Sequence, residues 1–200
     1  MSNVRLLAFA GSVRRGSFNR KALAVLGRGA ASAGAAVTSI DLRDYAMPIY
    51  DADWEAEHGL PPAAAALQAL VAGHDGLLLA SPEYNGFITP LLKNTLDWAS
   101  RPVPGVRGQS GLAFMKGKVA GLVSASPGSH GGMRSLGLAR QYLTNMGFLV
   151  VPEQVAIGGA ATAFGEDDDL KDDRLRTAVL AVGARVARVA AALATERRAV

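Results

Sequence analysis

The chain has 200 residues, of which 50% are hydrophobic and 19% are charged, a composition typical of a globular protein with a substantial core. It contains no cysteine, which excludes disulfides, thiol nucleophiles and cysteine-ligated zinc or iron–sulfur centres. The net charge is +4, but the arginines are scattered and form no basic cluster among aromatic residues, so we expect no nucleic-acid partner.

The N-terminal region has no positively charged segment followed by a long apolar stretch, and no apolar run is long enough to span a membrane. We therefore expect a cytoplasmic protein without a membrane partner, folded as one domain over residues 1–200. In a chain without thiols, redox chemistry requires a bound cofactor.

Residues 4–10 form an apolar run that predicts a buried strand. A glycine-punctuated loop over residues 11–19 follows, and a helix-forming segment begins at Arg20. This arrangement points backbone N–H groups and a helix N-terminus at an anion. The loop adds guanidinium, hydroxyl and amide groups that suit phosphate oxygens. We expect a phosphate-bearing ligand here; the alternative is an ordinary turn in which Ser17 caps the helix.

The loop does not match the nucleotide-binding glycine patterns. Val13 stands where the dinucleotide fingerprint requires its second glycine. Gly11 and Gly16 have the Walker A spacing, but Ser17 and Phe18 occupy the positions of its lysine and its serine or threonine. The loop therefore favours a terminal monophosphate held without a metal.

Residues 37–41 are predicted as a second strand, and residues 42–61 as a long irregular connection. Alternating acidic residues over 51–57 match no metal-binding spacing, so we expect a solvated acidic turn. Pro61 begins a helix that runs to about residue 72. Residues 76–80 are an uninterrupted apolar run, which is typical of a parallel strand covered on both faces.

The turn at residues 81–87 follows that strand at its carboxyl end, where open α/β sheets bind ligands. Tyr84 offers an aromatic face and a hydroxyl group. Asn85 and Gly86 tolerate the unusual backbone angles that let N–H groups point into a site. The alternative for Tyr84 and Phe87 is simple loop packing.

The second half of the chain continues to alternate helix and strand. His130 lies in a small-residue loop, and we expect it to form loop hydrogen bonds because no carboxylate is near it in sequence. Acidic residues 166–169 precede the last helix and Arg197 and Arg198 end it, which matches the helix dipole. The predicted elements are helices over residues 91–98, 136–143 and 175–193, a Pro/Gly-rich loop over 101–117, and strands over 119–124 and 148–151, with 155–157 a candidate continuation beyond Pro152.

Five strands that alternate with helices predict an α/β protein with three layers, α/β/α, and right-handed crossovers. We expect a doubly wound, five-stranded parallel sheet with the order 2-1-3-4-5. In that order the loops after strands one, three and four meet at the switch point. They would form one pocket, with a phosphate at the first helix and a planar group against the Tyr84 turn.

Three motifs stand in order along the chain: Gly11-Ser12-x-Arg14-x-x-Ser17-x-Asn19, Ser81-Pro82-Glu83-Tyr84-Asn85-Gly86, and Leu92-Lys93-Asn94-x-x-Asp97-Trp98. Together they resemble the NADPH-dependent FMN reductase family, flavodoxin-like enzymes that include quinone, chromate and azo-dye reductases. The similarity extends over nearly the whole chain. The resemblance implies a flavodoxin-like fold with FMN as the cofactor.

The resemblance also implies the residues that hold FMN. No catalytic side chain and no metal ligand is expected. The implied phosphate-site residues are Ser12, Arg14, Ser17, Phe18 and Asn19. The residues implied to border the isoalloxazine ring, chiefly through main-chain groups, are Pro82, Glu83, Tyr84, Asn85 and Gly86, and Ser126 completes the flavin contacts.

With NADPH or NADH as co-substrate, the implied reaction passes hydride to FMN and then to a small acceptor, such as a quinone, chromate, an azo compound or free flavin. A homodimer or homotetramer is implied as well. One alternative is a flavodoxin-like electron-transfer protein with a protein partner; such carriers dock through acidic faces, whereas this chain is positive. Another alternative is a binding domain that keeps the fold but binds no flavin. Such a domain would not require the polar residues that the first loop contains.

Overall fold

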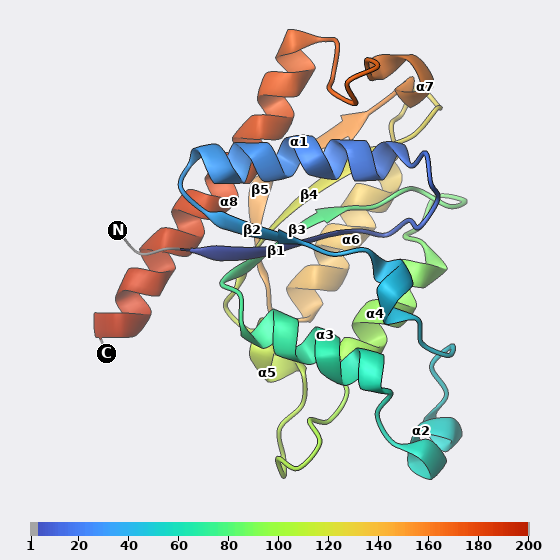
Figure 1. Cartoon of the computed structure of the whole chain (residues 1–200), viewed down its shortest axis with the longest axis vertical. Helices are drawn as coiled ribbons and strands as arrows, with labels where there is room; N and C mark the ends of the chain where they lie inside the picture. Colours follow the sequence, from blue (N-terminus) through green and yellow to red (C-terminus); the bar gives the residue numbers. More distant parts are fainter. Residues whose placement is uncertain (1–3, 200) are drawn as a thin grey trace.

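The computed structural model describes the backbone of residues 4–199 and the side chains up to residue 194. A parallel sheet forms the centre of the molecule (Figure 1). Its order is β2-β1-β3-β4-β5, which confirms the predicted doubly wound topology. The strands are β1 (Arg5–Ala10), β2 (Ala36–Ser39), β3 (Gly76–Ala80), β4 (Val119–Ala125) and β5 (Leu149–Ile157).

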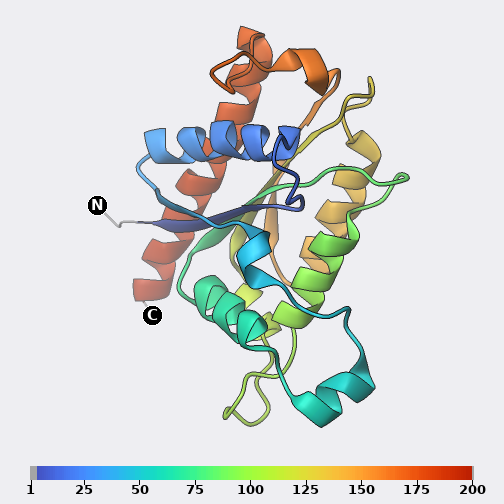
Figure 2. The same ribbon diagram turned by 45° about the vertical axis from the view of Figure 1, so that its right-hand side comes forward.

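Helices cover both faces of the sheet, as Figure 1 and the turned view in Figure 2 show. The helices α1 (Phe18–Ser32) and α8 (Asp173–Ala199) pack on one face. The helices α3 (Pro62–Ala72), α4 (Pro90–Ala99) and α6 (Met133–Asn145) pack on the other. Strand residues alternate between these two cores: in β1, Leu6 faces α1 and α8, whereas Leu7 faces the opposite layer.

The helices α1 and α8 approach each other closely because glycine lies at their contact. A Cβ atom on Gly183 of α8 would lie 2.0 Å from the carbonyl oxygen of Leu26 in α1. A Cβ atom on Gly29 would similarly lie 2.1 Å from the carbonyl oxygen of Leu180. The helix α8 is long and apolar enough by composition to cross a membrane. Its apolar side chains pack on α1 and the sheet instead, as in the core helix of a soluble fold.

The segment between β1 and α3 differs from the prediction in two respects. The second strand, predicted over 37–41, is Ala36–Ser39, because Asp41 turns away to cap the 3-10 helix η1 (Leu42–Tyr45) and accepts a hydrogen bond from the Arg43 N–H. The connection predicted as irregular over 42–61 contains α2 (Ala52–His58) as well, capped by Asp51. Two further short helices that the sequence did not predict are α5 (Leu112–Met115) and α7 (Ala160–Ala163).

Two acidic residues of this connection, Asp51 and Glu55, have structural partners. Asp51 accepts hydrogen bonds from the first turn of α2, and Glu55 forms an ion pair with Arg101 at 2.8 Å. Within residues 4–194, no cluster of histidine and carboxylate side chains has an arrangement that could hold a metal ion.

The last strand runs unbroken through Pro152, so the candidate continuation over 155–157 belongs to β5. Proline is tolerated because β5 lies at the edge of the sheet, where one side of the backbone needs no partner. The register with β4 shifts between Ala120 and Leu122, and the Arg140 guanidinium donates to the carbonyl of Val151 beside this irregularity. The helix α8 continues to Ala199, and the side chains of Arg197 and Arg198 lie outside the described residues.

Candidate functional site

The loops that follow β1, β3 and β4 meet at the carboxyl edge of the sheet, on the right-hand side of Figure 1. They enclose a cavity of about 310 Å³, a volume within the range of small-molecule sites. All the residues expected to hold FMN line it except Asn85 and Gly86. The lining residues are Ser12, Arg14, Ser17, Phe18, Asn19, Pro82, Glu83, Tyr84, Ala125, Ser126 and Pro127.

At one end of the cavity, the first loop leads into α1. The Ser17 hydroxyl caps this helix by accepting from the Arg20 N–H at 3.4 Å. The Arg14 guanidinium lies 5.0 Å from the centre of the Phe18 ring, and no carboxylate among the described residues pairs with it. A helix N-terminus and an unpaired guanidinium therefore face the same end of the cavity, which suits an anionic group.

Asn19 lines the cavity, but its side-chain amide is already engaged. Its Nδ2 donates to the Ala125 carbonyl at 2.8 Å, and its Oδ1 accepts from the Ala125 N–H at 3.0 Å. The residue is only 3% exposed. The amide joins the start of α1 to the end of β4, so it shapes the site by holding two loops together.

At the other end of the cavity, the turn after β3 is a two-residue hairpin. The N–H groups of Tyr84 and Phe87 each donate to the carbonyl of the other residue at 3.0 Å. Asn85 and Gly86 between them have φ values of 54° and 84°, as a type I′ turn requires. The Tyr84 side chain remains 56% exposed at the rim, where its ring can border a flat ligand.

The Glu83 carboxylate is directed toward α6. It accepts hydrogen bonds from the Arg134 Nε at 2.9 Å and from the Ser135 N–H at 3.2 Å. It therefore caps a helix whose own N-cap residue, Gly132, has no side chain. Burial raises the pKa of Glu83, but these donors outweigh burial and hold the pKa below its usual value. The carboxylate anchors the Tyr84 turn to α6, and Glu83 is also one of the residues that line the cavity.

The loop after β4 closes the cavity. The Ser126 N–H donates to the Ile157 carbonyl at 3.0 Å, and the Ser126 hydroxyl accepts from the Gly128 N–H at 3.3 Å. The His130 Nδ1 lies 3.4 Å from the Ser129 hydroxyl, which agrees with its expected role in loop hydrogen bonds.

Sequence reasoning missed three residues of this site. Ala125 and Pro127 line the cavity, and their position beside Ser126 is the signal that could have identified them. Arg134 holds Glu83, and the absence of a capping side chain at Gly132 is the only local sign that a distant partner is needed.

The third motif lies away from the cavity and has a structural role. The Asn94 side chain accepts from the Tyr50 N–H and donates to the Pro48 carbonyl, both at 2.8 Å. The Trp98 indole N–H donates to the same carbonyl at 2.8 Å. These bonds hold the connection between β2 and α2 against α4.

The described residues fit a ligand with a flat ring and one anionic tail. The anionic tail would meet Arg14 and the start of α1, and Pro82, Tyr84 and Pro127 line the same cavity with flat or apolar surfaces. FMN has this shape and charge distribution.

Known proteins are similar to this chain in sequence and in fold. Residues 4–162 match the family described as NADPH-dependent FMN reductase. The chain is 35% identical over 177 residues to an NAD(P)H-dependent FMN reductase of Pseudomonas aeruginosa, covering 87% of this chain and 88% of that protein. It is 38% identical over 140 residues to a probable NADPH:quinone oxidoreductase of Oryza sativa subsp. japonica, covering 69% of this chain and 63% of the rice protein, which is less than two thirds of that relative's length.

Among solved structures, the flavoenzyme FerB, an NAD(P)H:(acceptor) oxidoreductase from Paracoccus denitrificans, superimposes with a TM-score of 0.76 at 25% sequence identity. The superposition covers 92% of this chain and 96% of FerB. Because the family match spans most of the chain and the bacterial reductase aligns over nearly its whole length, this protein belongs to the NADPH-dependent FMN reductase family, flavin-dependent oxidoreductases that use FMN and NAD(P)H.

Proposed function

We propose that this protein reduces a small, electron-poor acceptor, such as a quinone, chromate, an azo compound or free flavin. The observation that carries the proposal is the cavity in which the loops after β1, β3 and β4 combine an anion-binding end with a flat, partly exposed end. The relative from rice is named as a quinone oxidoreductase, which supports a quinone as the first acceptor to test.

In this proposal, Ser12, Arg14 and Ser17, with the start of α1, hold the FMN phosphate. Phe18 positions the Arg14 guanidinium by lying under it, and Asn19 holds the loop against Ala125. Charge-assisted hydrogen bonds to phosphate are stronger than neutral ones, so Arg14 contributes most of the binding free energy among these side chains.

The turn after β3 holds the flavin ring in this proposal. Pro82 and Tyr84 border the ring, and Ser126 approaches it from the loop after β4. The backbone N–H groups of Glu83, Asn85 and Gly86 have no partner among the described residues, so they are free to stabilise negative charge that develops on the ring.

Bound FMN supplies the redox chemistry by accepting hydride from NAD(P)H and passing the electrons to the acceptor. The protein binds and orients the reactants, and we assign no side chain as a general acid or base. The open rim at Tyr84 leaves room for acceptors of different shapes, which supports loose acceptor specificity.

The test is steady-state oxidation of NAD(P)H by the FMN-loaded protein with a quinone and no other protein. We expect turnover with the quinone, and a shift in the flavin absorption spectrum when FMN is added to the cofactor-free protein. FMN binding without turnover until a protein partner is added would instead indicate an electron-transfer protein.

We also propose that the protein is a homodimer or homotetramer. Three large apolar side chains are exposed, those of Tyr84, Phe87 and Met133. A groove between α4 and α6 is lined by Phe87, Leu138 and Tyr142. A second copy would remove this apolar surface from water. Light scattering should give a multiple of the chain mass, and Phe87→Asp should shift it toward the monomer; a monomeric wild type would contradict the proposal.

We further propose that residues 1–200 form one FMN-binding domain that works in the cytoplasm without a membrane or nucleic-acid partner. The packing of α8 on the sheet supports this, since its apolar stripe is already covered by the fold. Cell fractionation should recover the protein in the soluble fraction; recovery with membranes would contradict the proposal.

A further inference from the structure

Among the described residues that line the cavity between the loops after β1, β3 and β4, Glu83 carries the only carboxylate. Its side chain is only 9% exposed. A carboxylate so far from water needs a cationic partner, because burial without one disfavours its charged form. The identity of that partner therefore matters for any ligand that shares the cavity with Glu83.

Arg134, at the start of α6, is that partner. Its Nε and Nη2 both donate to the Glu83 Oε1, the first at 2.9 Å. In the described part of the chain, no second lysine, arginine or histidine pairs with Glu83. The other carboxylate oxygen accepts from the Ser135 N–H at 3.2 Å, which directs the group toward α6. A single residue thus compensates the negative charge in the wall of the cavity.

The Arg134 guanidinium also lies beside the tip of the turn after β3. A Cβ atom on Gly86 would lie 3.9 Å from the Arg134 Cζ. At the base of the turn, a Cβ atom on Gly132 would lie 3.5 Å from the Glu83 Cβ, so the start of α6 packs closely on Glu83. Arg134 therefore lies next to both the base and the tip of the turn whose backbone N–H groups are expected to meet the flavin ring.

The charge of Glu83 matters because of what flavin reduction does to charge. Hydride transfer from the nicotinamide brings two electrons and one proton, so the ring gains one negative charge and the nicotinamide is left oxidised. An unpaired carboxylate nearby opposes a second negative charge, whereas a compensated one does not. The pairing of Glu83 with Arg134 therefore favours reduction of a ring bound in this cavity.

We propose that Arg134 is a positioning residue for flavin reduction: it holds the Glu83 carboxylate against α6 and cancels its charge, so that the turn after β3 binds the reduced ring better. The inference rests on the proposed function, because it requires FMN in the cavity. The quantity that tests it is the ratio of the dissociation constants for oxidised and reduced FMN. This ratio sets how far the reduction potential of bound FMN departs from that of free FMN.

Arg134→Gln removes the positive charge and leaves Glu83 in place. The Arg134 side chain is 71% exposed, so the substitution leaves no cavity in the core. Anaerobic titration against a reference redox dye gives the potential of bound FMN. We expect the preference for reduced FMN to fall at least about tenfold, which lowers the potential by about 30 mV for a two-electron couple. Arg134→Lys keeps the charge and should recover most of this loss.

The double variant Glu83→Gln/Arg134→Gln separates the effect of charge from that of structure. If Arg134 acts by cancelling the charge of Glu83, the double variant should return toward the wild-type potential, because no unpaired carboxylate remains. If Arg134 only holds the turn in place, the double variant should be impaired at least as much as Arg134→Gln. That second result would overturn the inference.

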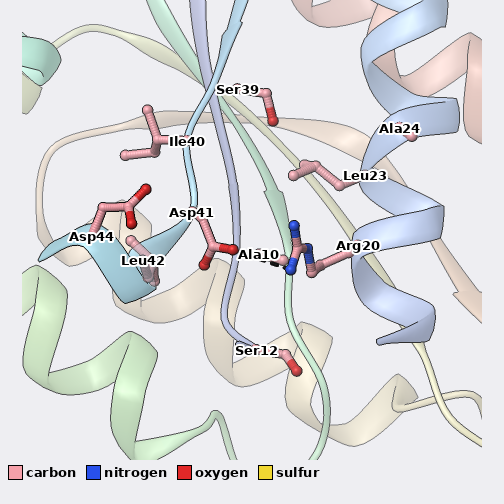
Figure 3. Close-up of a pocket in the computed structure, with 10 residues that line it drawn as sticks. All are labelled: Ala10, Ser12, Arg20, Leu23, Ala24, Ser39, Ile40, Asp41, Leu42 and Asp44. Carbon is pink, nitrogen blue, oxygen red and sulfur yellow. Dashed lines mark ion pairs between the residues drawn. The ribbon is translucent and has the colours of Figure 1, made fainter. Parts of the chain in front are cut away.

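A second ion pair at the carboxyl edge of the sheet provides the matched control. The side chains of Arg20 and Asp41 point toward each other, with the Arg20 Nη1 3.1 Å from the Asp41 Oδ2 (Figure 3). They line a second cavity, of about 410 Å³, between α1 and the end of β2. This cavity shares Ser12 with the first, but neither Arg20 nor Asp41 lines the first.

Arg20→Gln removes one positive charge and the cationic partner of a carboxylate, as Arg134→Gln does. Any effect on the FMN phosphate is the same for oxidised and reduced FMN, so the potential should stay at the wild-type value. Equal potentials in the wild type and Arg134→Gln would contradict the inference, and so would equal losses in Arg134→Gln and Arg20→Gln. Failure of the proposed function is recognised separately, as a wild type that binds no FMN or oxidises no NAD(P)H.

Discussion

The side-chain amide of Asn19 forms two hydrogen bonds with the backbone of Ala125, 106 residues away in sequence. One joins the Asn19 Nδ2 to the Ala125 carbonyl at 2.8 Å, and the other joins the Ala125 N–H to the Asn19 Oδ1 at 3.0 Å. The pair fixes the start of α1 against the end of β4. The loop before α1 and the loop after β4 are therefore held at a fixed distance from each other. A ligand that contacts both loops requires this.

Asn19→Ala should destabilise the protein, because it leaves the buried N–H and carbonyl of Ala125 without these partners. The expected loss in the free energy of unfolding is roughly 1–3 kcal/mol for each group left unpaired. Urea unfolding measures it. Asn145→Ala is the control, since Asn145 is exposed on α6, and it should change stability by no more than about 0.5 kcal/mol. Equal stability of the two variants would show that the Asn19 amide does not hold the loops.

Glu83→Gln should remove a pH-dependent contribution to stability. Because the donors Arg134 and Ser135 lower the pKa of Glu83 in the folded protein, its contribution is fully present above the usual value of 4.5 and is lost as the pH falls through the lower, folded-state pKa. The wild type should therefore unfold less readily than Glu83→Gln at pH 7, and the difference should shrink below pH 4.5. Urea unfolding across this pH range measures it.

The control for Glu83 is Glu57→Gln, which changes an exposed carboxylate without a hydrogen bond among the described residues. It should have little effect on the free energy of unfolding at either end of the pH range. A difference between wild type and Glu83→Gln that stays constant down to pH 3 would contradict the assigned role of the Glu83 carboxylate.

Arg14→Ala should weaken FMN binding, because Arg14 has no carboxylate partner in the described chain and lies at the anionic end of the cavity. A charge-assisted contact contributes ~1.5–3 kcal/mol, so the dissociation constant should rise by roughly ten- to a hundredfold. Flavin fluorescence titration measures it. Arg15→Ala removes the neighbouring guanidinium, which does not line the cavity, and should have a much smaller effect. Equal effects of the two variants would indicate general charge attraction in place of a specific contact.

Gly183→Ala should destabilise the contact between α8 and α1. The added methyl group would lie 2.0 Å from the Leu26 carbonyl oxygen, so the helices must move apart. Overpacking of this kind costs about 1–3 kcal/mol. Gly137→Ala is the matched helical control, because a Cβ there has no neighbour within 4 Å, and it should stabilise the protein by about 0.5–1 kcal/mol. In thermal unfolding, Gly183→Ala should lower the midpoint temperature and Gly137→Ala should raise it.

Element types, the parallel sheet and loop placement could be predicted because they depend on local pattern, whereas the strand order 2-1-3-4-5 was expected from the flavodoxin-like fold that the family resemblance implies. The side chains of the apolar run at 76–80 can be removed from water only if layers cover both faces of the strand. The alternation of strands with helices predicts that the sheet is parallel. The Asn85-Gly86 pair similarly specifies its turn, since only such residues adopt positive φ at low cost. The helix α2 was missed because its seven residues are too few to give an apolar period, and its stability depends on the Asp51 cap and on the ion pair between Glu55 and Arg101.

By itself, the sequence determined the element types, the parallel sheet and the three loops at its carboxyl edge, because hydrophobic period, glycine positions and chirality act over a few residues at a time. Only the tertiary structure decided what each polar side chain does there. It showed that the Asn19 amide binds Ala125, that the Glu83 carboxylate caps α6, and that Asp41 borders a second cavity beside Ser12. Such roles depend on which hydrogen-bonding partner lies within about 3 Å, and that partner is set by the folding of segments far apart in the chain.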